Sequence, residues 1–368
     1  MIYLDANANA PLRPCAADAM ASAMKAAGNP SSVHGPGRAQ RRIVDEAREA
    51  VAAMVGAAPE RVVFTASGTE ANNLALRGVG ARAVLASAVE HVSVLDAADD
   101  VRRVPVSDAG LLDLDALAAM LGEDGRSAIV SVMLANNETG AIQPVARAAE
   151  IAHAHGALLH CDAAQAAGRI AIDMATLGAD MFTLSAHKMG GPMGAGALVL
   201  ARDLDLDPIL RGGGQERRRR AGSENVPAIA GFGAVAAEVA LLLAEARRLA
   251  DLRDGLEARL LAEAPDAVVF GAAVPRLPNT SCIAMPGASA ETQVIAFDLA
   301  GFAVSAGAAC SSGKVAPSHV LAAMGVPETL AASAIRVSLG WHNTAAETVA
   351  FARAWLGLHA RFSAPRAA

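Results

Sequence analysis

Residues 128–162 read AIVSVMLANNETGAIQPVARAAEIAHAHGALLHCD, and the order of the segments in this stretch indicates the fold class. Two short apolar runs, 128–134 and 157–161, are typical of buried strands, and 144–155 between them has the apolar spacing of a helix. Strands that alternate with helices in this way form a mostly parallel sheet covered by helices on both faces. The stretch therefore predicts an α/β fold.

The alternation extends over most of the chain. We expect further strands at 62–65, 83–86, 101–106 and 181–184, and further helices at 70–79, 89–97 and 114–121. Residues 223–264 read as a long helix with one break, and strands at 268–270, 281–285 and 335–338 with helices at 290–300 and 344–360 follow it. This change of order predicts a large domain over 15–255, which holds the parallel sheet, and a smaller α+β domain formed by 1–14 and 256–368.

The charge of the chain argues against nucleic-acid and membrane partners. Its 368 residues carry a net charge of −6, which disfavours binding to nucleic acid or to an anionic membrane surface. The one basic run, 217–220, is flanked by Glu216 and Glu224 and reads as a solvated loop. The apolar stretches are too short to span a bilayer, and the first residues do not have the pattern of a signal peptide.

The cysteines and histidines give no sign of a disulfide framework or a metal site. Four cysteines are scattered along the chain, which fits a reducing cytoplasm. Cys161 and Cys282 read as buried packing residues. His153 and His155 lie two positions apart, on different faces of a helix, so we expect no metal to bind there.

Lys188 is the first candidate for chemistry. It follows the apolar run 180–184 and precedes the glycine-rich segment 190–194. A lysine that is desolvated at the end of a buried strand is the nucleophile needed to hold pyridoxal phosphate (PLP) as a Schiff base. Most lysines are solvated surface charges, so this interpretation depends on the other pieces of such a site.

Two stretches supply those pieces. Residues 64–73 (FTASGTEANN) pass from a strand through small residues into a helix, whose first amides suit a phosphate, although an ordinary helix cap is the alternative. Asp162 ends a strand where α/β sheets bind ligands, and its carboxylate can pair with a pyridine nitrogen and make the ring an electron sink; a helix cap is again the alternative. Gln165 is placed to bind the ring oxygen. Residues 134–140 follow the strand before His160, so we expect their polar end at the same ligand-binding edge of the sheet.

Three further residues complete the constellation. His91, near a helix start, is placed to stack on the ring and to move protons, although a lone histidine is more often structural. Cys310 lies in SAGAACSSG at 305–313, a loop of small residues that can carry a thiol to a substrate and away again. Arg336 is a charge inside an apolar strand, and a substrate carboxylate is the anion that a buried arginine needs.

With these residues in this order, the chain resembles the NifS/IscS-type cysteine desulfurases, in the class V branch of the fold-type I PLP-dependent transferases. The resemblance runs from Tyr3 to about Gly340. It is carried by the segments 29–32, 64–73, 90–91, 135–140, 160–165, 185–188, 212–226, 305–312 and 335–340. The chain departs from the family in having Asn9-Ala10-Pro11 where Thr-Thr-Pro is common, and Met193 where lysine is common.

The resemblance implies a role for each candidate residue. By it, Lys188 holds the cofactor, His91 stacks on the ring, Asp162 pairs with the ring nitrogen, and Asn137 and Gln165 lie near the substrate and the ring oxygen. By it, Gly68, Thr69, Ser185 and His187 hold the phosphate, and Ser223 of the partner subunit in a homodimer completes that cup. By it, Arg336 takes the carboxylate of L-cysteine and Cys310 receives the sulfur.

The implied reaction converts L-cysteine into L-alanine and leaves a persulfide on Cys310, which passes its sulfur to a scaffold or carrier protein for iron–sulfur clusters or other sulfur-containing cofactors. A class V aminotransferase and a selenocysteine lyase are the alternative enzymes. A protein that binds no PLP and only relays sulfur on the same scaffold is the alternative outside enzymes.

Overall fold

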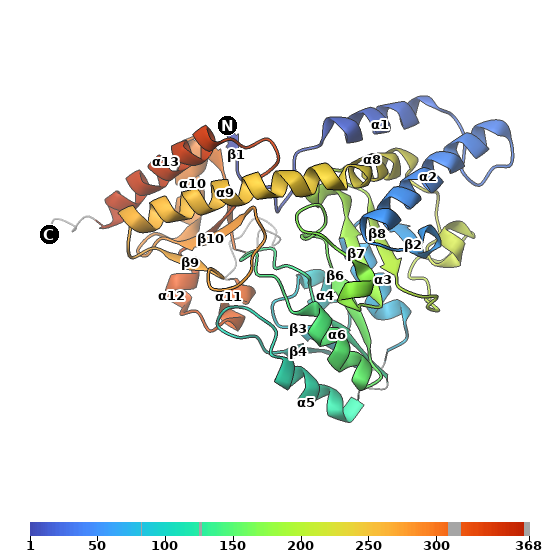
Figure 1. The fold of residues 1–368 in the computed structure, drawn as a ribbon, viewed down its shortest axis with the longest axis horizontal. Helices are drawn as coiled ribbons and strands as arrows, with labels where there is room; N and C mark the ends of the chain where they lie inside the picture. Colours follow the sequence, from blue (N-terminus) through green and yellow to red (C-terminus); the bar gives the residue numbers. More distant parts are fainter. Residues whose placement is uncertain (82, 125–126, 308–317, 364–368) are drawn as a thin grey trace.

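Two sheets, joined by one long helix, organise the computed structural model, which describes residues 1–81, 83–124, 127–307 and 318–363 (Figure 1). Helix α9 (Val239–Glu263) begins beside the larger sheet and ends beside the smaller one. Its Leu242 belongs to the first apolar core, and its Leu256 and Leu260 belong to the second.

The larger sheet has seven strands, of which most are parallel, as the sequence predicts. In spatial order they are β2 (Val62–Thr65), β8 (Gly196–Leu200), β7 (Met181–Ser185), β6 (Leu158–Asp162), β5 (Ala128–Ser131), β3 (Ala83–Ser87) and β4 (Val101–Val104). Strand β8 is antiparallel to both of its neighbours. The sequence pattern does not predict β8, because an alternation of strands and helices gives no reason to expect a strand directly after β7.

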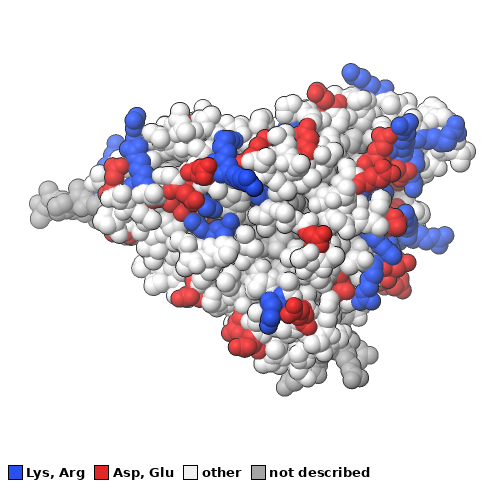
Figure 2. Space-filling model, in the orientation of Figure 1, with Lys and Arg blue, Asp and Glu red and all other residues white. Residues whose placement is uncertain are grey.

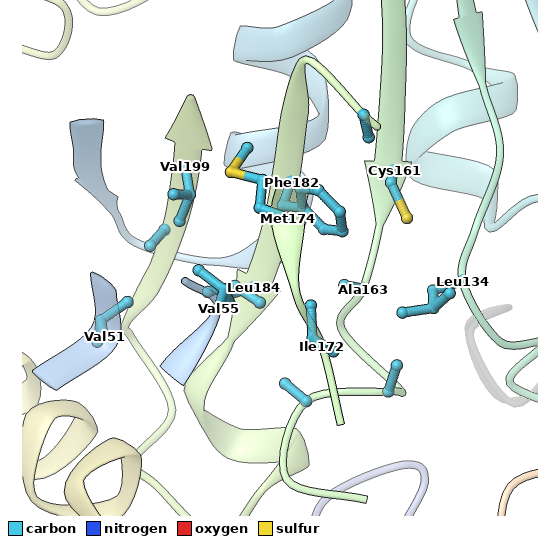
Figure 3. Close-up of a cluster of buried hydrophobic side chains, with 14 of the residues drawn as sticks. Val51, Val55, Leu134, Cys161, Ala163, Ile172, Met174, Phe182, Leu184 and Val199 are labelled. Atoms are coloured by element: carbon cyan, nitrogen blue, oxygen red, sulfur yellow. The ribbon is translucent and has the colours of Figure 1, made fainter. Parts of the chain in front are cut away.

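Both faces of this sheet are covered. Phe182 and Leu184 alternate with Met181 along β7, so that the first two enter one apolar cluster and Met181 enters another on the opposite face. Figure 3 shows Cys161 of β6 in the same cluster as Phe182 and Leu184. A strand buried on both faces is typical of a parallel sheet between helices.

In the sequence, the helices that cover the sheet lie before, between and after its strands. They are α1 (Pro14–Lys25), α2 (Gly35–Met54), α3 (Gly68–Gly78), α4 (Val92–Leu95), α5 (Leu114–Asp124), α6 (Val145–Ala154), α7 (Met174–Leu177) and α8 (Val226–Ala237). Helices α1 and α2 both pack on α8. The helix expected at 89–97 is only one turn long, because the chain turns before His91 caps α4.

The smaller sheet is antiparallel and has four strands in the order β12 (Ser305–Ala306), β13 (Ala334–Ser338), β10 (Thr280–Ala284) and β9 (Val268–Phe270). Its helices are α10 (Ala290–Leu299), α11 (His319–Ala323), α12 (Glu328–Ala331) and α13 (Ala345–Ser363). Phe297, Phe351 and Trp355 fill the core between them. Strand β1 (Ile2–Tyr3) pairs beside this core with β11 (Phe302–Ala303).

The long helical segment has one break, as expected; it falls at Glu238, and α8 and α9 meet there at 66°. No single helix within the described ranges has the length and apolar composition needed to cross a membrane; α8 and α9 meet that test only as a bent pair. On the face shown in Figure 2, side chains of both charge signs are interspersed. The pairs Arg41–Asp45 and Arg42–Glu46 on α2 are ion pairs of neighbouring helical turns.

Candidate active site

Polar residues from both sheets meet around one cavity of about 400 Å³. Most of the residues that the sequence singles out line it: Gly68, Thr69, His91, Asn137, Asp162, Gln165, Ser185, His187, Lys188 and Arg336. The carboxyl ends of β6 and β7 supply Asp162 and Ser185, because parallel strands end at the same edge of a sheet. The volume lies in the range of small-molecule sites.

Lys188 lies at the end of the short 3-10 helix η3 (Ala186–Lys188), directly after β7. Its Nζ donates hydrogen bonds to the carbonyl oxygens of Asn7, at 2.7 Å, and Ala8, at 3.0 Å. The backbone oxygen of Lys188 accepts a hydrogen bond from Arg169. The N-terminal segment thus fixes the ammonium group at the cavity, and the sequence analysis gave no role to Asn7.

The start of α3 forms one end of the cavity. Ser67 caps the helix by accepting a hydrogen bond from the amide of Glu70, so the helix-cap interpretation is correct for this serine. Gly68 and Thr69 follow it, and the first amides of a helix have no acceptor within the helix. A Cβ atom on Gly68 would lie 3.4 Å from Cβ of Ser185, which places the helix start directly against the end of β7.

The field at this end of the cavity favours an anion. Burial, followed by the charges of Lys188 and Arg169, lowers the pKa of His187 to about 4. Burial, followed by the charge of Arg336, lowers the pKa of Arg169 to about 9. Positive groups resist protonation where other positive groups and low polarity surround them. An anion bound beside His187, which lines the cavity, would offset this positive field.

Asp162, at the end of β6, is held by two hydrogen bonds. Its Oδ1 accepts from the amide of Ala164 at 2.9 Å, and its Oδ2 accepts from Nδ2 of Asn72 at 2.8 Å. A carboxylate accepts about four hydrogen bonds, so both oxygens keep capacity for a further donor. Asn72 has no obvious signal in the sequence, apart from its place one turn into the helix that begins at Gly68.

His91 is linked to Asp162 through two side chains. Nδ2 of Asn72 also donates to Oγ of Ser93 at 2.9 Å, and this oxygen lies 2.8 Å from Nδ1 of His91. The backbone amide of Ser93 donates to the same ring nitrogen at 3.1 Å. Because Nδ1 is an acceptor, the neutral ring carries its proton on Nε2.

Glu90 is a second buried acid, next in sequence to His91. Burial, followed by the charge of Asp162, raises the pKa of Glu90 well above its usual value. Its Oε1 accepts a hydrogen bond from the amide of Met133 at 2.5 Å, and Oε2 has no partner within the described part of the chain. Burial and the neighbouring charge thus favour the protonated form of Glu90.

Both polar atoms of the Gln165 side chain form hydrogen bonds with the protein. Its Nε2 donates to the carbonyl oxygen of Asn7 at 3.0 Å, and its Oε1 accepts from Arg169. The residue still lines the cavity. It therefore connects the lysine-holding segment to the wall of the site.

Arg336 enters the cavity from the smaller sheet and is almost fully buried, with 3% of its surface exposed. Its Nη2 lies 2.7 Å from Oδ1 of Asp5, and its Nη1 donates to the carbonyl oxygen of Asn137 at 3.1 Å. Its Nε is buried and has no hydrogen-bond partner among the described residues. This guanidinium can accept a further anion from the cavity.

Cys310 lies outside the described residues. The segment that contains it leaves the described fold after Gly307 and re-enters at Ser318, and a Cβ atom on Gly307 would lie 3.4 Å from Cβ of Ser318. Oγ of Ser318 donates to Oε2 of Glu138, a buried acid on the wall of the cavity, at 2.5 Å. Both flanking residues therefore lie beside the site.

Two other cysteines are packing residues, as expected. Cys161 and Cys282 are 0% and 2% exposed. Burial raises the pKa of both thiols, so neither forms the reactive thiolate readily.

Ser223 is exposed and does not line this cavity, and the loop before it is not simply solvated. Glu216 is buried, and its oxygens accept from Arg48 at 2.7 and 2.8 Å and from the amide of Phe64 at 2.9 Å. Residues 216–218 have positive φ angles of 44°, 55° and 67°. A conformation that side chains rarely adopt persists here because the buried ion pair fixes it.

The cavity fits PLP on the chemistry of its own groups. It offers a helix start with cationic surroundings for a phosphate, a lysine amine for an aldehyde, and a carboxylate with spare acceptor capacity for a ring nitrogen. The guanidinium of Arg336, which lines the cavity, would serve the carboxylate of an amino acid. The described residues therefore match the donor set that the cofactor and an amino-acid substrate need.

Comparisons with known proteins agree with this interpretation. Residues 2–351 match the family model for class V aminotransferases. A cysteine desulfurase of Cereibacter sphaeroides is 46% identical over 361 residues, which cover 94% of this chain and 92% of that protein. A crystal structure of a NifS-like protein from Rickettsia africae superposes with a TM-score of 0.90 at 35% identity and covers 98% of this chain and 99% of its own.

A third similarity is to a solved structure of SspA in complex with cysteine. Its TM-score is 0.80 at 27% identity, and the match covers 94% of this chain and 100% of that one. The expected family and the expected fold are thus confirmed. The chain belongs to the class V aminotransferase family and, within it, to the cysteine desulfurases.

Proposed function

We propose that this chain is a PLP-dependent cysteine desulfurase, which converts L-cysteine into L-alanine and takes up the sulfur as a persulfide of Cys310. The observation that carries the proposal is that Asp162 of β6, Lys188 of η3 and Arg336 of β13 line one cavity. The similarity to a cysteine desulfurase at 46% identity and to a structure with bound cysteine supports the choice of substrate.

The cofactor would be held by residues at both ends of the cavity. Gly68, Thr69, Ser185 and His187 would hold the phosphate, Lys188 would hold the aldehyde, and Asp162 would bind the ring nitrogen. When bound, PLP supplies an electron sink that stabilises negative charge on the α-carbon of an amino acid. Asp162 strengthens this effect because its carboxylate keeps the nitrogen proton in place.

The chain's own residues bind the substrate and move its protons. Arg336 and Asn137 would bind the substrate at its carboxylate end, where the guanidinium already lies. Lys188 Nζ would take the α-proton, since a desolvated lysine amine can act as a general base. His91 would act as a donor through Nε2, because Ser93 occupies Nδ1.

Sulfur transfer needs a thiol in addition to these groups. In the proposed step the Cys310 thiolate attacks the substrate sulfur, an S–S bond forms and the C–S bond breaks. The substrate carbon keeps the electron pair and takes up a proton to give L-alanine, so L-cysteine and one thiol become L-alanine and one persulfide. The flanking residues Gly307 and Ser318, which lie beside the cavity, support this role.

The finer biological setting is also a proposal. A scaffold or carrier protein would accept the persulfide sulfur for iron–sulfur cluster or other sulfur-containing cofactor biosynthesis in the cytoplasm. The enzyme would act as a homodimer in which Ser223 of the partner subunit completes the phosphate cup. The exposure of Ser223 and the fixed conformation of the loop before it support this arrangement.

The decisive experiment follows alanine and sulfur together. With PLP and L-cysteine, the wild-type chain should form L-alanine and gain one sulfur (~32 Da) on the peptide that contains Cys310. Cys310→Ser should form no L-alanine, and the matched control Cys282→Ser should remain active. Borohydride should fix the cofactor to Lys188 alone.

The alternatives give different results. An aminotransferase would pass the amino group to a keto acid and would not depend on Cys310. A selenocysteine lyase would favour the selenium substrate and would retain activity in Cys310→Ser. A protein that binds no PLP would be colourless. Desulfuration at the wild-type rate by Cys310→Ser would contradict the proposed role of this thiol.

A further inference from the structure

The anion site of Arg336 already contains an anion. Asp5 lies next to β1, and its Oδ1 is 2.7 Å from Nη2 of Arg336. Its other oxygen, Oδ2, accepts a hydrogen bond from Oγ of Ser305 at 2.7 Å. Ser305 and Arg336 face each other across β12 and β13. Asp5 thus sits between the guanidinium and the strand that leads toward residue 308.

The guanidinium keeps binding capacity despite this pair. Arg336 has five N–H donors, and the structure shows one directed at Asp5 and one at the carbonyl oxygen of Asn137. Arg336 lines the cavity and keeps N–H donors that the described residues do not engage. A second carboxylate can therefore bind while Asp5 stays in contact, and it would then share one positive charge with Asp5.

We propose that Asp5 is an internal counter-ion that weakens the binding of the substrate carboxylate by Arg336 and so sets the affinity for L-cysteine and L-alanine. This inference rests on the proposed function. Two carboxylates beside one buried guanidinium repel each other, and the repulsion is strong where water is excluded. Asp5 also keeps Arg336 neutralised when the cavity holds no substrate, which a buried cation needs.

Weaker binding of the substrate carboxylate by Arg336 has a chemical advantage. The carboxylate of the substrate does not react, so Arg336 binds it equally well in L-cysteine, in the transition state and in L-alanine. Binding that is uniform along a reaction lowers KM without raising kcat. It also slows the release of L-alanine. A counter-ion that loosens this contact therefore favours turnover.

The test separates the charge of Asp5 from its hydrogen bonds. In Asp5→Asn the amide oxygen can still accept from Arg336 and the amide nitrogen can donate to Ser305, but the negative charge is gone. L-Alanine is titrated into the PLP-loaded wild type and variant, and binding is followed by the absorbance of the cofactor and by the rise in Tm. We expect Asp5→Asn to bind L-alanine about tenfold more tightly, equivalent to about 1.4 kcal/mol.

Two further variants keep the test decisive. Asp5→Ala also lacks the charge and should bind L-alanine more tightly than the wild type, so it replaces Asp5→Asn if the latter does not fold. Glu257→Gln is the matched control, because Glu257 forms a buried ion pair with Arg276, at 2.7 Å, outside the cavity. It should lower stability and leave L-alanine affinity unchanged.

The outcomes distinguish this inference from the proposed function. Equal or weaker L-alanine binding by the uncharged Asp5 variants, or equal tightening in Glu257→Gln, overturns the counter-ion role. In the uncharged Asp5 variants the KM for L-cysteine should fall together with the Kd for L-alanine, while kcat does not rise. A rise in KM would mean that Asp5 only orients Arg336. A wild-type chain that forms no L-alanine overturns the proposed function and leaves the binding result standing.

Discussion

His160 should make the stability of this protein sensitive to acid. The imidazole is buried between β5 and β7, with Nδ1 2.9 Å from Oγ of Ser131 and Nε2 3.0 Å from Oγ1 of Thr183. Burial lowers the pKa of His160 from 6.5 to about 4, although the charge of Asp162 acts in the opposite direction. The folded protein therefore resists protonating a ring that the unfolded chain protonates readily.

The size and sign of the effect follow from the two pKa values. Between pH 6.5 and about 4 the unfolded chain binds more protons than the folded one, so the free energy of unfolding falls as the pH falls. The full difference corresponds to about 3 kcal/mol, which is present above pH 6.5 and is lost by about pH 4. Within this window His160 contributes a slope of up to about 1.4 kcal/mol per pH unit.

The assay is urea unfolding at a series of pH values, followed by tryptophan fluorescence. His160→Gln keeps polar atoms for the two hydroxyl groups but cannot be protonated, so its unfolding free energy should fall less steeply below pH 6.5 than that of the wild type. His187 has a pKa lowered in the same direction and remains in both proteins, so it cancels in the comparison. His153→Gln, at a histidine whose side chain is 45% exposed, is the control. Identical pH slopes for wild type and His160→Gln would refute the reasoning.

Two further predictions concern the Arg48–Glu216 ion pair and Asp162 in the cavity. Glu216→Ala should lower the free energy of unfolding by about 3–5 kcal/mol, because it leaves the buried guanidinium of Arg48 without its partner; a loss below about 1 kcal/mol in urea unfolding would show that water solvates Arg48. Asp162→Asn should lower kcat at least ~100-fold while PLP affinity, measured by dialysis, changes far less. A fall of only a few-fold in kcat would exclude Asp162 as the group that tunes the ring.

Much of the site was predictable because it lies at strand ends. Asp162 and Lys188 follow apolar runs on neighbouring parallel strands, and the carboxyl ends of such strands share one edge. Arg336 was recognisable as a charge within an apolar strand. In each case a local pattern in the sequence determines both the element and the side of the sheet on which the residue appears.

The residues that the sequence analysis missed act through distant partners. Asn72 and Asn7 are amides without a periodic pattern, and their partners lie 90 and up to 331 positions away. Glu216 looked like part of a charged loop, and only the packing of Arg48 shows that it is buried. Strand β8 was missed because five apolar residues after a glycine-rich loop do not reveal an antiparallel return.

Asn7 has a consequence for how the chain reaches its active form. Its amide donates to Ser338, its side chain bonds Thr280, and its carbonyl oxygen holds Lys188, so one residue ties together segments separated by up to 331 positions. Contacts of such long range form late in folding, because a large loop must close first. On the ribosome, Asn7 cannot form its hydrogen bond to Ser338 until almost the whole described chain has been synthesised. The full set of contacts that holds Asn7, and through it Lys188, is therefore complete only after synthesis has passed Ser338.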